Sequence, residues 1–190
     1  MKIGSPHRHP PMIALEQRDK NARLPRVRRR RRVRCGRGSA GYIQGVRYAL
    51  PQPFLDLEHT ADAGVEVEGG TGQEALARLV LALAALLGGG QVATGGRDEV
   101  FEVSSEPGLE GVAVALLREL LFRFATERVL PVACEVLQLS PEQARVMVSL
   151  APYDPHLHAE GLDIKAVTRH EALLGCDTSG RWRGRILFDI

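Results

Sequence analysis

The sequence Trp182-Arg183-Gly184-Arg185-Ile186-Leu187-Phe188-Asp189-Ile190 ends the chain and alternates as a half-buried strand does. Successive side chains of a strand point to opposite faces. One face therefore holds Trp182, Gly184, Ile186, Phe188 and Ile190, and the other holds Arg183, Arg185, Leu187 and Asp189. We expect the first, more apolar face to pack against the core, so Asp189 should lie on the face that points away from the core.

Two hairpins are expected in the second half of the chain. The last strand follows the turn-rich residues 175–180, so we expect it to pair with residues 166–173. Residues 132–139 and 144–150 flank a four-residue loop in which Pro141 suits a turn. Strands joined by such short loops are antiparallel.

Two helices are expected before these hairpins, each preceded by a short segment that predicts a strand. The first covers residues 72–87 and begins with a capping box of Thr71 and Glu74. It is apolar on both sides, so we expect it to be buried on much of its circumference. The second has Ser105 as its N-cap and runs to about Thr126. The whole pattern predicts an α+β fold, with two helices packed on a mainly antiparallel sheet.

Charge divides the chain at about residue 50. Residues 1–50 contain fourteen Lys and Arg and two Asp and Glu, whereas residues 51–190 contain eleven and twenty-one. The formal charges of the two parts are +12 and −10, so the net charge of +2 describes neither. We expect residues 51–190 to form one domain and residues 1–50 to be a basic, mostly disordered extension.

The basic extension has two interpretations. Its run of five arginines at positions 28–32 would suit a tether to nucleic acid or to an anionic surface. The interpretation that we favour is a solvated or misassigned extension, because hardly any aromatic residue lies among the arginines and Met12 offers a second start.

Sequence features also bear on the cellular compartment. No apolar run reaches the ~20 residues needed to cross a bilayer, and the first residues lack the apolar region of a secretory signal. Cys35, Cys134 and Cys176 are odd in number and widely spaced, which predicts neither a disulfide framework nor a zinc ribbon. We expect a cytoplasmic protein with no membrane partner.

Acidic groups at two distant places indicate a metal site. Asp62 lies near the start of the body, and Asp189 precedes the terminal Ile190. A fold that brought them together would place three carboxylates at one point: those of Asp62 and Asp189 and the terminal carboxylate of Ile190. The repulsion between these groups would favour a divalent cation. Oxygen ligands favour calcium, magnesium or manganese over zinc. The simpler alternative is that Asp62 organises a turn and that Asp189 is exposed or pairs with an arginine.

Five motifs follow one another along the body. They are His59-Thr60-Ala61-Asp62-x-Gly64, Asp154-x-x-x-His158, Lys165-Ala166-Val167-Thr168-x-His170, Trp182 and the terminal Asp189-Ile190. Together they resemble the archease family, from about Phe54 to Ile190. Ala63 and Arg169 depart from the family pattern, which usually has Ile and an aromatic residue there. The second departure leaves the surface roles of Lys165 and His170 open.

The resemblance implies an α+β protein without catalysis of its own that acts on an RtcB-type RNA ligase in tRNA splicing. It implies that the protein promotes guanylylation and multiple turnover of that ligase, to which GTP belongs, and meets tRNA or other RNA only through it. The family's divalent-metal site falls on Asp62, Asp189 and Ile190, with calcium as the first candidate and magnesium or manganese as alternatives. Candidate contacts to the partner are His59, Lys165 and His170.

Two other classes of function remain open at this point. A small metal-dependent hydrolase or transferase would use Asp62 and Asp189 to hold magnesium and His59 or His170 as the base. A polar cleft beside the metal would favour this class over an accessory protein. An RNA-binding module would depend on the basic extension alone.

Overall fold

The computed structural model describes residues 45–58 and 62–190. Most of the predicted basic extension, and the candidate contact His59, lie outside the described residues. Within them the chain forms nine strands and two helices. The elements are β1 (Arg47–Ala49), β2 (Leu55–Glu58), β3 (Asp62–Gly69), α1 (Gly72–Leu87), β4 (Arg97–Ser104), α2 (Leu109–Glu127), β5 (Val129–Leu139), β6 (Gln143–Pro152), β7 (Ala166–Val167), β8 (Leu173–Cys176) and β9 (Trp182–Asp189).

The strands form two antiparallel sheets. The first has the order β1-β5-β6-β4, and the second has the order β2-β3-β9-β7, with β8 also paired to β9. The predicted hairpin of β5 and β6 is confirmed. In the second sheet β9 is central, because β3 pairs with one of its edges and β7 and β8 pair with the other.

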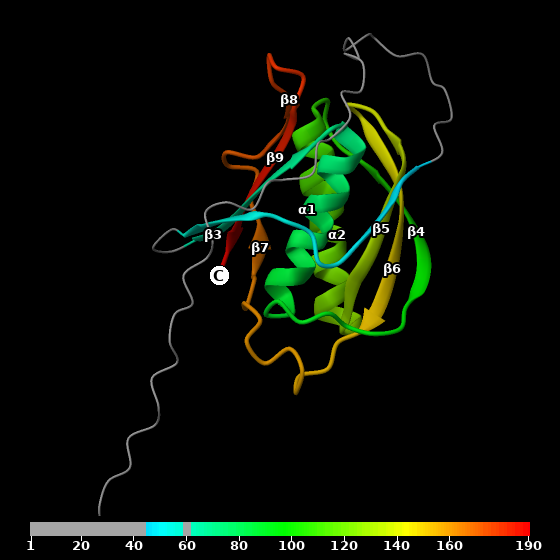
Figure 1. Ribbon diagram of the computed structural model, residues 1–190, viewed down its shortest axis with the longest axis vertical. Coiled ribbons are helices and arrows are strands. Elements are labelled where there is room, and N and C mark those ends of the chain that lie inside the picture. The colour runs from blue at the N-terminus through cyan, green and yellow to red at the C-terminus, as the bar shows by residue number, and fades with distance from the viewer. Residues whose placement is uncertain (1–44, 59–61) are drawn as a thin grey trace, which may run out of the picture. The chain divides into compact units, whose positions relative to one another are not determined.

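The two helices lie between the sheets, as Figure 1 shows. Helix α1 contacts β1 and β5 of the first sheet and β3, β8 and β9 of the second, and α2 also contacts strands of both. This arrangement explains why α1 is apolar all round: a helix covered on two sides has little surface left for water. The α+β prediction is confirmed, although the helices pack between two sheets and not on a single one.

The helix ends agree with the sequence at α1 and differ at α2. Thr71 accepts a hydrogen bond from the backbone N–H of Glu74 at 3.1 Å, and the Glu74 carboxylate accepts one from the N–H of Gly70 at 2.8 Å. Helix α2 begins only at Leu109, after an N-cap glycine with φ of 143°. The predicted N-cap Ser105 is wrong, because its hydroxyl donates to the carbonyl oxygen of the next residue.

Strand β9 packs the second sheet against the helices. Ile186 and Phe188 on its inner face have no exposed surface. Gly184 lies so close to α1 that a Cβ atom there would be 2.8 Å from Leu79. Each large buried side chain of this kind stabilises the fold by ~1.5–3 kcal/mol. Asp189, on the opposite face, is exposed as the alternation predicted.

Strand β1 lies inside the stretch of residues 1–50 that we expected to be an extension. It pairs with β5, and the Arg47 guanidinium donates to both carboxylate oxygens of Asp98 on β4, at 2.8 and 3.0 Å. The buried Ser149 hydroxyl on β6 also donates to Asp98. Residues 47–49 therefore belong to the domain.

The predicted strand over residues 166–173 is wrong as a single element. It is divided into β7 and β8 by a turn in which Glu171 has a φ of 52°. The Thr168 side chain accepts a hydrogen bond from the backbone N–H of His170 at 2.8 Å. Such local side-chain bonds compete with a strand ladder, which explains the break. Neither helix of the described residues has the length and apolarity to span a bilayer.

Candidate metal centre

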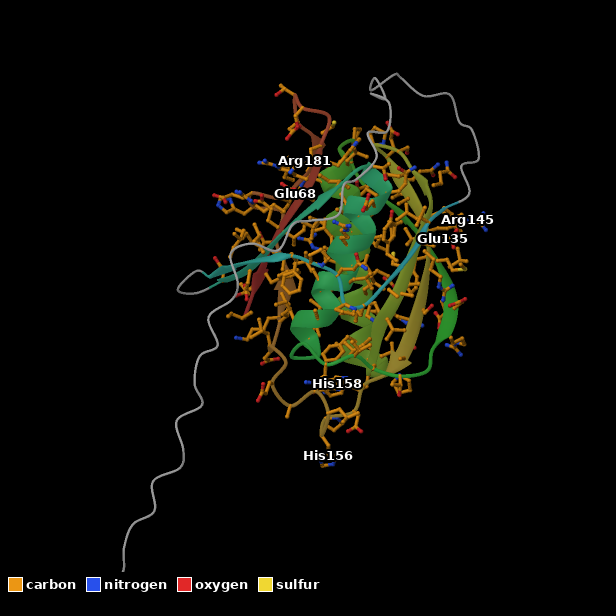
Figure 2. All side chains as sticks on the ribbon, viewed as in Figure 1. Glu68, Glu135, Arg145, His156, His158 and Arg181 are labelled. Carbon is orange, nitrogen blue, oxygen red and sulfur yellow. The ribbon has the colours of Figure 1, made fainter. Side chains whose placement is uncertain are left out.

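The outer face of the second sheet bears a row of opposite charges on β3 and β9. Glu66 lies opposite Arg185 and Glu68 lies opposite Arg183 in the register of the two strands. The Arg185 guanidinium donates to Glu66 at 2.8 Å. Glu68 also accepts a bond of 2.8 Å from Arg181, which lies beside it in Figure 2. Opposite charges in such positions stabilise a strand pair.

The same face ends in two like charges. Asp62 on β3 lies directly opposite Asp189 on β9, in the register that also pairs Glu66 with Arg185. We call these two residues the acid pair. Among the described residues no side chain forms a hydrogen bond or an ion pair with either carboxylate. Like charges directly opposite one another are destabilising, so this end of the row favours a cation from outside the described chain.

The backbone brings Lys165 to the acid pair as well. Its N–H donates to the carbonyl oxygen of Asp189 at 2.8 Å, and the next residue pairs with Asp189 in the ladder of β7 and β9. The Lys165 side chain is exposed. Ile190 follows directly and is 40% exposed. The register therefore brings together four of the six residues named from the sequence: Asp62, Lys165, Asp189 and Ile190.

His170 does not join this group. It lies in the turn between β7, which ends opposite Phe188, and β8, which begins opposite Arg185. Its imidazole is 79% exposed, with Nε2 3.8 Å from a carboxylate oxygen of Glu171. His170 is therefore several residues away from Asp189 along the sheet and does not belong to the acid pair.

His158 has a structural role in the loop between β6 and β7. Its Nδ1 accepts a hydrogen bond of 3.0 Å from the backbone N–H of Asp154, and its ring stacks on Tyr153 with centroids 5.1 Å apart. The ring is almost fully buried. In Figure 2 it lies closer to the helices than His156, which is at the tip of the loop. These contacts explain the spacing of Asp154 and His158.

The described residues hold no group of three His, Cys, Asp or Glu side chains that would suit a metal ion. A metal at the acid pair would therefore take two side chains and complete its shell with backbone oxygens, water or residues outside the described ranges. Three surface hollows within the described ranges have other linings, and neither Asp62 nor Asp189 belongs to them.

Comparison with known proteins assigns the chain to a protein family. A model of the archease protein family (MTH1598/TM1083) matches residues 54–190. The chain belongs to the archease family. The archease of Methanopyrus kandleri is 30% identical over 142 residues, which are 73% of this chain and 99% of that protein. The archease of Methanosarcina mazei is 29% identical over 138 residues, which are 70% of this chain and 93% of that protein.

The archease fold is also the fold of a solved structure. The solution structure of Methanobacterium thermoautotrophicum protein 1598 matches with a TM-score of 0.53 and 22% identity, over 72% of this chain and 98% of that one. Membership of the archease family implies an accessory protein that acts on a protein partner. The match begins at residue 54, so the basic extension lies outside it.

Proposed function

We propose that this archease activates an RtcB-type RNA ligase in tRNA splicing and RNA repair, in the cytoplasm and without catalysis of its own. The protein promotes guanylylation of the ligase by GTP and allows it multiple turnovers. It reaches tRNA only through the ligase. Family membership supports the accessory role, and the acid pair on the outer face of β3 and β9 is the observation on which the proposed mechanism depends.

The donor set of the acid pair fits a divalent cation. Asp62 and Asp189 present carboxylate oxygens on one face of the sheet, next to the backbone of Ile190, and no described side chain neutralises them. Hard oxygen donors suit calcium, magnesium or manganese, and the resemblance to the archease family makes calcium the first candidate. A bound divalent ion would supply positive charge at this edge and join the ends of β3 and β9.

The position of the acid pair suits contact with a large partner. The pair lies at the end of a sheet face, with Asp189 exposed, and it does not line three surface hollows found among the described residues. Lys165, whose backbone N–H donates to Asp189, has an exposed side chain that can meet a phosphate or a carboxylate of the partner. An exposed, charged edge of this kind favours docking over the enclosure of a small substrate.

The test is a multiple-turnover ligation assay with the cognate ligase and GTP. Asp62→Asn and Asp189→Asn should each lower the archease-dependent rate at least tenfold, while Glu142→Gln, an exposed acid in the turn between β5 and β6, should leave it unchanged. Guanylylation of the ligase, measured in the same samples, should fall in parallel. Full activation by both Asn variants would remove the acid pair from the mechanism.

Metal binding needs a readout independent of the ligase. Calorimetric titration of the isolated protein with calcium, magnesium and manganese should show one site that both Asn variants lose and Glu142→Gln keeps. Hydrolysis of RNA or nucleotide by the protein alone, abolished by Asp189→Asn, would instead favour a metal-dependent hydrolase and contradict the accessory role.

A further inference from the structure

A hollow of about 350 Å³ lies at the C-terminal end of α1, away from the acid pair. It is bounded by the connection from β1 to β2, by the residues that follow α1, and by the loop before β7. Its walls are mainly apolar and include Leu50, Phe54, Leu86, Val92 and Leu162. Val92 is 42% exposed, so apolar surface continues to the mouth of the hollow.

Two carboxylates are the only charged side chains among the described residues that line this hollow: Asp56 and Glu160. Both are exposed, and neither forms a hydrogen bond or an ion pair with another described side chain. The last turn of α1, which ends at the hollow, contains no basic residue. Since the C-terminal end of a helix also favours positive charge, every electrostatic feature of the hollow has the same sign.

The fold fixes the backbone at both carboxylate residues, each through a different element. Asp56 on β2 lies opposite Val65, whose side chain is fully buried on the inner face, so Asp56 is also on the inner face of the second sheet. The loop that bears Glu160 is fixed to the end of α1, where Leu162 donates to the carbonyl oxygen of Leu86 at 2.9 Å.

The approach of that loop to α1 is close. A Cβ atom on Gly89, whose φ is 60°, would lie 2.7 Å from the backbone of Glu160. One on Gly161 would lie 2.0 Å from the carbonyl oxygen of Leu87. Backbone contacts this tight form the hollow before any ligand arrives, as in most binding sites.

We propose that this hollow binds a lysine or arginine side chain presented by a flexible segment of a partner protein. Such a side chain has an apolar stem that fits apolar walls and a cationic head that stays at a polar rim. An anionic group would face two carboxylates, and a neutral apolar group would cover them without compensation. The site shares no residue with the acid pair and does not depend on the proposed action on a ligase.

Charge complementarity favours a protein segment as the occupant. Residues 51–190 have a formal charge of −10, so a basic segment that reaches the surface of this part of the chain is attracted to it at short range. The exposed Val92 at the mouth offers contact to an apolar residue beside the basic one. A free small cation would use the rim but not this surface.

The test compares two capped five-residue peptides, one with arginine between two leucines and one with the neutral isostere citrulline in its place. In NMR titrations of the full chain, both methyl signals of Val92 and Leu162 should shift on addition of the arginine peptide. The Kd obtained from these shifts should be at least tenfold lower for the arginine peptide than for the citrulline peptide. Equal binding of the two peptides, or no binding of either at 10 mM (about −2.7 kcal/mol), would overturn the proposal. Free arginine binding as tightly as the peptide would overturn the assignment to a protein segment.

Variants of the chain locate the binding. Asp56→Asn with Glu160→Gln should weaken the arginine peptide about tenfold and leave the citrulline peptide unchanged, because only two exposed charge pairs are lost. Ala85→Leu, which fills the hollow from α1, should abolish binding of the arginine peptide. Glu142→Gln is a control for the loss of one exposed negative charge away from the hollow. Equal weakening by this control, or full affinity in the double variant, would show that the hollow is not the site.

Discussion

Removal of one carboxylate of the acid pair is expected to stabilise the metal-free protein. Side chains directly opposite on antiparallel strands have Cβ atoms ~5 Å apart, and two unit charges at ~5 Å in a fully aqueous environment repel by ~0.8 kcal/mol. Measured effects of like cross-strand pairs are ~0.2–1 kcal/mol. Asp189→Asn should therefore raise the free energy of unfolding by ~0.5 kcal/mol, or Tm by ~1–2 °C in a chain of this length.

A divalent cation should make the native protein more stable than Asp189→Asn, the reverse of the order expected without metal. At a free concentration one hundred times its Kd, a ligand that binds only the folded state stabilises it by ~2.7 kcal/mol, or ~5–10 °C in Tm. The native pair should gain this amount, whereas Asp189→Asn should gain almost none. With metal present the variant becomes the less stable protein.

Thermal unfolding at low ionic strength, followed by circular dichroism first with EDTA and then with 1 mM calcium, measures both effects. The control Glu66→Gln removes an attractive pair with Arg185 on the same face, so it should lower Tm with EDTA and keep the calcium response. A lower Tm for Asp189→Asn in EDTA would refute the repulsion between the two carboxylates. An undiminished calcium response in that variant would refute the metal site itself.

Three further perturbations test the fold around the site. Gly184→Ala should lower the free energy of unfolding by ~1–3 kcal/mol in urea titrations, because the new Cβ atom would lie 2.8 Å from Leu79 of α1. The control is Gly175→Ala, where the nearest atom to the new Cβ would be 3.6 Å away. This control should change the free energy of unfolding by under ~0.5 kcal/mol. Thr71→Ala removes the N-cap of α1 and should cost ~1 kcal/mol in the same assay. Hydrogen bonds from Arg47 and then from Ser149 lower the pKa of Asp98 to about 2 from its ordinary 3.8. Because the folded-state pKa is lowered, ionised Asp98 stabilises the fold above pH ~4, and this stabilisation is lost as pH falls through 2. In an acid titration, the difference in free energy of unfolding between the native protein and Asp98→Asn should therefore vanish between these two pH values.

Local patterns predicted those elements whose signals are local. The capping box of Thr71 and Glu74 located α1 to the residue. The alternation of β9 predicted the buried Ile186 and Phe188 and the exposed Asp189 correctly, but it was wrong for Leu187, which is buried, and for Ile190, which is 40% exposed. Ser105 misled because a serine hydroxyl can bond to a neighbouring carbonyl group as readily as it caps a helix. The division of the strands into two sheets depends on contacts between distant residues, which no short window of sequence contains.

The candidate site shows the same limit. Asp62 and Asp189 could be associated from the sequence because five ordered motifs resembled a family, and the register then placed them opposite one another. The carboxylates of the hollow, Asp56 and Glu160, belong to no motif. They are brought together only by the edge pairing of β2 and by the fixed loop after β6, so no spacing rule could have found them.

The register of β9 joins the core to the acid pair. Phe188 is fully buried and Asp189 is exposed, so a shift of one residue would turn the apolar side chain to water and the carboxylate inward. The cost of exposing Phe188 and Ile186 is several kcal/mol, far above the repulsion between the two carboxylates. Core packing thus keeps Asp62 opposite Asp189, and the repulsion expected between their carboxylates is what a divalent cation would relieve.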